Sequence, residues 1–348
     1  MTLIRNSLCI ITLLSASLSF AQTIDQPPLP ETEAYVSLRA GFNYVYSDGP
    51  DDAANGRDFL SRAGIKAKQK ITPDLTALAL VEYGERGDNG VDFKQNEAPG
   101  LRRLQLGLAN QHHKILAGSQ TLIWHSFVRS AYFSDGNDTL RQGTIRDDDL
   151  LQYYFTNGPL KLAAGLHLEA QEGDSVDQLQ LAGQYQLGAI KAQLAWSKDQ
   201  RGDNKGNLLG TRVWWQLAGL TLSGYYHLAD EDYDLYAGSS TGNVRLTETP
   251  DEGSINAVPS CASEERSSTG IYSSYRINNH QLHGRLAADQ CKTSGDVRSA
   301  KVEYINHLSK QFRLWVSAEG LSNDLTRRPA TSNAISMSEL QLGVRMDF

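Results

Sequence analysis

The last eleven residues of the chain are the clearest guide to its fold class. They run from Ser338 to Phe348 and read Ser-Glu-Leu-Gln-Leu-Gly-Val-Arg-Met-Asp-Phe. Apolar side chains occupy every second position from Leu340 to Phe348, and glutamine, glycine, arginine and aspartate stand between them. Because neighbouring side chains of a strand point to opposite faces, the stretch predicts a strand with one apolar and one polar face.

The same alternation recurs from Ala34 onward in about sixteen segments, each of roughly ten residues. Their approximate spans are 34–46, 59–70, 75–84, 101–110, 113–119, 149–156, 159–169, 178–187, 189–198, 210–217, 219–229, 269–277, 280–289, 297–306, 312–320 and 338–348. The polar faces carry charges, glutamines and glycines, which cannot form a dry core without unsatisfied polar groups. The pattern predicts an all-β protein, a transmembrane antiparallel barrel with a water-lined interior.

The connections between these segments alternate between short and long. The short ones are 71–74, 110–112, 157–159, 188, 218, 278–279 and 309–311. The long ones are 47–58, 85–100, 120–148, 170–177, 199–209, 230–268, 290–296 and 321–337. Outer-membrane barrels have short periplasmic turns and longer external loops, so we expect this orientation here.

The first residues indicate export. Arg5 precedes an apolar run from Leu8 to Leu18, and Ser19-Phe20-Ala21 fits a cleavage site. The run is too short and too interrupted by polar residues for a membrane anchor, which is the alternative. We therefore expect a signal peptide over 1–21, a periplasmic lead-in over 22–33 and the barrel over 34–348.

Composition excludes several classes of function. The formal net charge of -7 argues against nucleic acid as a partner. The sequence has no Gly-x-Ser-x-Gly elbow, phosphate-binding loop or zinc signature, so we expect no enzyme activity, cofactor or metal.

Four short motifs resemble strands of the general Gram-negative porins. They are 61–66 (Ser-Arg-Ala-Gly-Ile-Lys), 75–82, 102–108 (Arg-Arg-Leu-Gln-Leu-Gly-Leu) and 116–120 (Leu-Ala-Gly-Ser-Gln). The chain departs from the family at Leu80, where glutamine is usual, and at Ser119, where arginine is usual. The resemblance implies an outer-membrane homotrimer that passes small hydrophilic solutes and ions by diffusion. Its other expected partners are outer-membrane lipids, lipopolysaccharide and the barrel assembly machinery.

In the resembling family the third external loop folds into the barrel and narrows the pore. Here that loop is 120–148, and we expect its Asp135 and Asp138 to face charged residues of the barrel wall. The expected wall residues are Arg39, Arg62, Lys66, Glu82 and Arg103. Opposed charges across a constriction create a transverse field that sorts solutes by charge and size. The alternative is that the loop aspartates only contact water.

Other readings of the barrel stay open. Trp214 and Trp315 have inward parity and could stack sugars, which would suit a substrate-selective channel for sugars or small anions. A third hypothesis is a non-conducting structural or adhesive barrel with a plugged lumen.

Cys261 and Cys291 lie in neighbouring external loops that flank one predicted hairpin. Because the compartment beyond the inner membrane is oxidising, we expect these two cysteines to form a disulfide bond.

The aromatic residue that ends the chain predicts an assembly phenotype. In the resembling family a terminal aromatic is part of the signal that the assembly machinery reads. Deletion of Phe348 is therefore expected to lower insertion into the outer membrane while export to the periplasm continues. Cell fractionation with heat-modifiability on gels measures both steps, and a normal level of inserted protein would contradict the prediction.

Overall fold

The computed structural model describes the following parts of the chain: residues 29–47, 53–84, 91–92, 100–129, 145–168, 176–200, 206–231, 233, 265–292, 295–323 and 336–348. The expected signal peptide lies outside these ranges, as do Asp135, Asp138 and Cys261. Among the helices within them, none is long and apolar enough to cross a membrane.

The described residues form one antiparallel sheet of eighteen strands that closes on itself. The strands are β1 (Glu31–Ser47), β2 (Ala53–Asp58), β3 (Arg62–Lys70), β4 (Thr76–Gly84), β5 (Val91–Asp92), β6 (Gly100–Ala109), β7 (His113–Thr121), β8 (Arg146–Asn157), β9 (Leu160–His167), β10 (Gln178–Leu187), β11 (Ile190–Asp199), β12 (Asn207–Leu217), β13 (Leu220–Ala229), β14 (Arg266–Ile277), β15 (His280–Cys291), β16 (Gly295–His307), β17 (Phe312–Asn323) and β18 (Ser336–Asp347). A short helix, η3 (His125–Arg129), follows β7.

Sixteen strand positions make up the wall. β2 and β3 pair with successive halves of β1 and share one position, and β5 pairs with β2. The described sheet has eighteen strands. Counting β2 and β3 as one position and leaving out the two-residue β5 gives sixteen. This confirms the prediction of an antiparallel barrel of about sixteen strands. The segment 53–58, expected to be external loop, instead extends the wall as β2.

The first and last strands close the barrel. Eleven pairs join β1 to β18, from Ser37 opposite Asp347 to Ser47 opposite Met337. Beyond them, the Phe348 N–H donates to the Val36 carbonyl at 2.9 Å, and the Val36 N–H donates to the Phe348 carbonyl at 3.2 Å. Closure leaves no edge strand whose backbone groups would be unpaired in lipid.

The two faces of the wall have opposite character. On β18, Leu340 and Leu342 point outward and are 46% and 49% exposed, whereas Glu339 and Gln341 point inward and are 4% and 1% exposed. A soluble protein would bury the leucines and expose the polar residues. The reversed pattern fits a lipid-facing exterior and a polar lumen.

A break between β2 and β3 turns an aromatic side chain into the lumen. Leu60 has a φ of 74°, and the Phe59 N–H donates to the Arg39 carbonyl at 3.0 Å. The Phe59 ring is buried edge-on against Trp315 of β17, with centroids 4.7 Å apart. Trp315 therefore faces inward as predicted, but it packs within the wall lining and is only 3% exposed.

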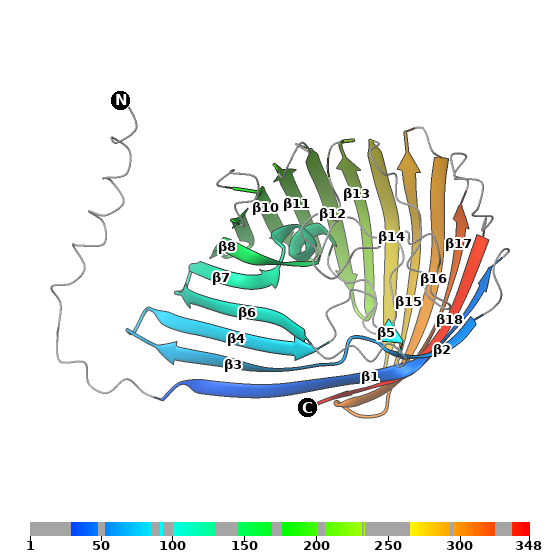
Figure 1. The fold of residues 1–348 in the computed structure, drawn as a ribbon, viewed down its shortest axis with the longest axis horizontal. Helices are drawn as coiled ribbons and strands as arrows, with labels where there is room; N and C mark the ends of the chain where they lie inside the picture. Colours follow the sequence, from blue (N-terminus) through cyan, green and yellow to red (C-terminus); the bar gives the residue numbers. More distant parts are fainter. Residues whose placement is uncertain are drawn as a thin grey trace.

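Figure 1 shows β10 to β18 side by side along one wall, with β1, β3, β4, β6 and β7 sweeping round below them. The turns 71–75, 110–112, 158–159, 188–189, 218–219, 278–279 and 308–311 gather at one end of the strands, as the short–long alternation predicted. We call this the short-turn end, and η3 lies inside the wall near β10, β11 and β12.

Candidate functional site

The chain that follows β7 turns into the barrel and packs against its inner face. Ile123, Trp124, Phe127 and Val128 are all almost fully buried in one apolar cluster. Their partners on the wall are mainly small inward-facing residues: Tyr154, Ala163, Ala182, Ala195, Leu208 and Ala229. The start of the predicted third loop therefore lies in the lumen, held by burial of apolar surface.

Two polar contacts fix this segment against the strands beneath it. The backbone N–H of Trp124 donates to Gln180 Oε1 at 3.2 Å, and Arg212 Nη1 donates to the Val128 carbonyl at 3.4 Å. Gln180 and Arg212 are themselves buried on β10 and β12. Both contacts satisfy groups that would otherwise be costly to bury.

Two glycines of the wall make room for the loop. A β-carbon at Gly210 on β12 would collide with the Trp124 ring and lie 2.9 Å from the His227 side chain. A β-carbon at Gly165 on β9 would lie 2.8 Å from Ile123 Cδ1. The close approach of the loop to the wall requires glycine at Gly210, where the rigid indole ring would be displaced, whereas at Gly165 the end of the Ile123 side chain would have to shift.

A cluster of charged residues stands across the lumen from this loop. β1 and β11 are eight positions apart in the sixteen-strand ring, so β1 and β3 face the strands that hold η3, and β4 and β6 continue the wall beside them. Glu82 of β4 accepts hydrogen bonds from Tyr35 Oη at 2.6 Å and Arg102 Nε at 3.2 Å. Arg62 Nε lies 3.8 Å from the same carboxylate.

A β-bulge explains the second arginine of this cluster. The pairing of β4 with β6 shifts after Glu82, which opposes Arg103, while Tyr83 opposes Leu101. Arg102 is the extra residue, and the bulge points it inward, where it is 4% exposed. Sequence alternation predicted Arg103 on the inner face and missed Arg102, since it assumes an unbroken strand.

The structure places the other predicted wall residues as follows. Arg39 is buried on the inner face of β1, and its Nε donates to Ser37 Oγ at 3.2 Å. Lys66 is inward but lies near the short-turn end, where its Nζ meets Glu33 Oε1 at 3.0 Å and covers the Tyr35 ring. Arg39, Arg62, Glu82 and Arg103 thus share one side of the lumen, and Lys66 adjoins them through the ring of Tyr35, whose hydroxyl donates to Glu82.

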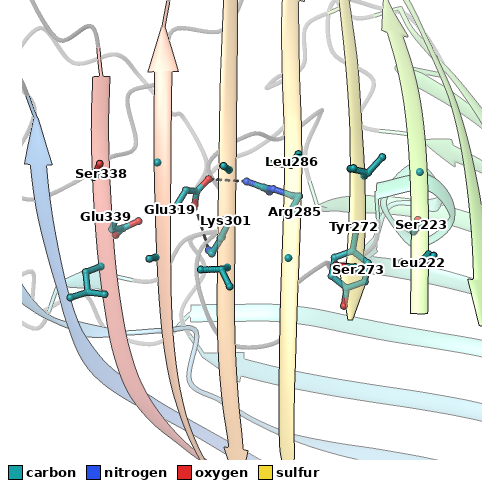
Figure 2. Close-up of a pocket in the computed structure, with 18 of the residues that line it drawn as sticks. Leu222, Ser223, Tyr272, Ser273, Arg285, Leu286, Lys301, Glu319, Ser338 and Glu339 are labelled. Carbon is teal, nitrogen blue, oxygen red and sulfur yellow. Dashed lines mark hydrogen bonds and ion pairs between the residues drawn. The ribbon is translucent and has the colours of Figure 1, made fainter. Parts of the chain in front are cut away.

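A second set of charges crosses β15, β16 and β17. Arg285 Nη2 lies 2.8 Å from Glu319 Oε1, and Lys301 Nζ lies 3.5 Å from Glu319 Oε2. Figure 2 shows these side chains converging from neighbouring strands. Ser299 Oγ also donates to Glu319 at 2.6 Å. Strand alternation gives each of these residues inward parity, but only the fold brings them into contact.

The lipid-facing side of the same strands is hollowed into an apolar groove of about 980 Å³. Small outward-facing residues form its floor and include Gly224, Gly284, Ala300, Ala318 and Gly320. Tyr44 and Trp215 border it. Its lining also includes Arg285, Lys301 and Glu319 of the charged network.

Cys291 ends β15 and is disulfide-bonded. Its expected partner, Cys261, lies outside the described residues, so that pairing stays a prediction. Next to it, Lys292 Nζ meets Glu265 Oε2 at 3.1 Å, and this hydrogen bond raises the pKa of Lys292. The contact ties the start of β14 to the end of β15 at the long-loop end.

Comparison with known proteins agrees with this geometry. The family described as Gram-negative porin matches residues 7–247. The chain belongs to that family. It is an outer-membrane porin whose wall crosses the membrane many times.

Solved structures share the fold of this porin. The chain is similar to an anion-selective porin from Comamonas acidovorans, with a TM-score of 0.68, 14% identity, and coverage of 92% of this chain and 100% of that chain. It is also similar to OmpF of Salmonella typhi in complex with daunomycin, with a TM-score of 0.67, 14% identity, and coverage of 91% and 97%. The trimer form of OmpT from Vibrio cholerae gives a TM-score of 0.62, 15% identity, and coverage of 92% and 99%. Curated protein sequences contain no match to the chain.

The glycine contact predicts the effect of one substitution on pore width. Gly210→Val is expected to push Trp124 off the wall, because its side chain would occupy the space of the indole ring. Release of the loop should raise single-channel conductance in planar bilayers or make it unstable. Gly320→Val is the control, since Gly320 faces open space outside the wall. Unchanged conductance of correctly inserted Gly210→Val would show that Trp124 does not hold the loop.

Proposed function

We propose that this porin is a water-filled channel through which small hydrophilic solutes and ions diffuse passively across the outer membrane. The charged inner wall is the observation that supports this most strongly. Charged groups in a lumen without water would pay a large desolvation cost, whereas a hydrated pore solvates them. In the alternative, a plugged and non-conducting barrel, these charged groups would be buried without water and would bear the full desolvation penalty.

We propose that the constriction lies between the loop after β7 and the wall formed by β1, β3, β4 and β6. In this proposal Asp135 and Asp138, which follow η3 along the chain, face Arg39, Arg62 and Arg103. Glu82 holds Arg62 and Arg102 in position within the basic wall. Opposed charges at this level would produce a transverse field across the pore.

The assembly proposed for this porin is a homotrimer. The trimer form of the similar Vibrio cholerae structure supports it. The outward apolar residues would contact outer-membrane lipids and lipopolysaccharide. Insertion would use the barrel assembly machinery with Phe348 as part of the signal, after removal of the peptide 1–21 during export.

A substrate-selective channel is the second candidate function. Trp214 supports it, because its ring is on the inner face of β12 and only partly buried. Arg212 and Lys191 both lie over this ring. Solute-dependent block of the ionic current separates a selective channel from general diffusion.

Neutralising the basic wall is expected to change ion selectivity. We consider the triple variant Arg39→Gln, Arg62→Gln, Arg103→Gln. Its chloride-to-potassium permeability ratio should be about two- to threefold lower than that of the wild type, because the pore loses three positive charges and keeps Glu82. The reversal potential in a potassium chloride gradient measures this ratio.

The matched control removes three lysines outside the lumen. We call Lys198→Gln, Lys292→Gln, Lys310→Gln the surface control variant, because it changes the net charge by the same amount as the arginine variant. Its reversal potential should equal that of the wild type. An equal shift in both variants would refute a role for the wall arginines, and absence of stepwise current from the wild type would refute the channel.

A further inference from the structure

A row of lysines follows the inner wall at the short-turn end, beginning on β7, which pairs with β6 of the arginine cluster. Lys114, Lys161 and Lys191 are each the second residue of their strands β7, β9 and β11. All three share the inward parity of their strands and are half-buried. The repetition places three ammonium groups at the same height of the barrel.

Aromatic rings hold these lysines in place. Lys114 and Lys161 lie over the same Tyr154 ring, 4.5 and 5.3 Å from its centroid. Lys191 lies 4.8 Å from the centroid of Trp214. We call Lys114, Tyr154, Lys161, Lys191 and Trp214 the lysine–aromatic ledge. Cation–π contacts position the ammonium groups without neutralising their charge.

The ledge carries uncompensated positive charge. Within the described part of the chain, none of its three lysines has a carboxylate partner. The inward residues between them on β10 and β11 are neutral: Gln184, Gln186 and Gln193.

The acidic residues of these strands are at the opposite end. Asp199 on β11 is eight residues from Lys191, which is about 26 Å along a strand. This distance exceeds the Debye length of about 8 Å at physiological salt. A carboxylate so far away therefore offsets little of the positive charge of the ledge.

The ledge lies directly against the loop that narrows the lumen. Lys161 Nζ is 5.1 Å from the centroid of the Phe127 ring in η3. Arg212, whose guanidinium stacks 3.9 Å from the Trp214 centroid, donates to the Val128 carbonyl of the same segment. A solute that passes the constriction therefore meets the ledge on its way to the short-turn end.

We propose that the lysine–aromatic ledge binds small oxyanions that carry two or more negative charges, such as di- and tricarboxylates or phosphate esters. A single exposed ion pair is weak, but one multivalent anion engages several ammonium groups at once. The proposal rests on the proposed function, because a solute reaches the ledge only through a hydrated lumen.

The test measures block of chloride current through the full-length porin in planar bilayers. Citrate and glycerol 3-phosphate are the two anionic probes, and mannitol is the neutral control of similar size to citrate. We call the triple variant Lys114→Gln, Lys161→Gln, Lys191→Gln the ledge variant. Its half-maximal block should require about a tenfold higher concentration of either anion than that of the wild type. The surface control variant should match the wild type, and mannitol should have no charge-dependent effect.

Equal sensitivity of the wild type and the ledge variant to both anions would overturn the proposal. Block by only one probe, lost in the ledge variant, would restrict the ligand to carboxylates or to phosphates. Loss of block in the surface control variant as well would also refute the ledge, since it would indicate a general effect of charge.

A second readout separates failure of the site from failure of the channel. Trp214 lies under Lys191, so anion binding should change tryptophan fluorescence of the detergent-solubilised porin, and Trp214→Phe should abolish this change. A saturable fluorescence change without conductance would support the site and refute the channel. Conductance without any fluorescence change or anion block would refute the site and leave the channel intact.

Discussion

The pairing of β1 with β18 is the constraint on which the rest of the structure depends. In hydrocarbon an unpaired backbone N–H or C=O costs several kcal/mol, so a sheet that crosses a membrane must close. The bonds between Val36 and Phe348 complete that closure at the last residue of the sequence. Closure divides every strand into a lipid face and a lumen face, and this division explains why glutamates and arginines lie inside while leucines are exposed.

Closure also creates an interior that the chain then partly fills. The segment after β7 lies on small residues of β9 to β13, and the arginine cluster around Glu82 stands on the opposite wall. The two sides differ in chemistry: one is an apolar seat for the loop, and the other is a charged surface. Below the seat, the lysines of β7, β9 and β11 give the short-turn end of the lumen a positive character. The pore therefore offers solutes two basic regions in series.

Much of the fold could be predicted from the sequence, because lipid on one face and water on the other impose a period of two on each strand. The pattern of Leu340, Leu342 and Val344 is enough to orient β18. Arg102 could not be found in this way, since the bulge at Glu82 changes the parity within β6. The wall residues on which the loop packs could not be identified from the sequence either. Trp124 and Phe127 were visible in the loop, but only the fold reveals that Gly210 and Ala195 lie beneath them.

All of these features depend on a closed wall whose inner face lines water and whose outer face contacts lipid. Cysteine scanning along β10 in lipid vesicles tests it most directly, with a membrane-impermeant thiol reagent applied to Gln184→Cys, Tyr185→Cys, Gln186→Cys and Leu187→Cys. The account predicts reaction at 184 and 186 and protection at 185 and 187. Uniform reaction at all four positions, or protection at 184 and 186, would contradict it.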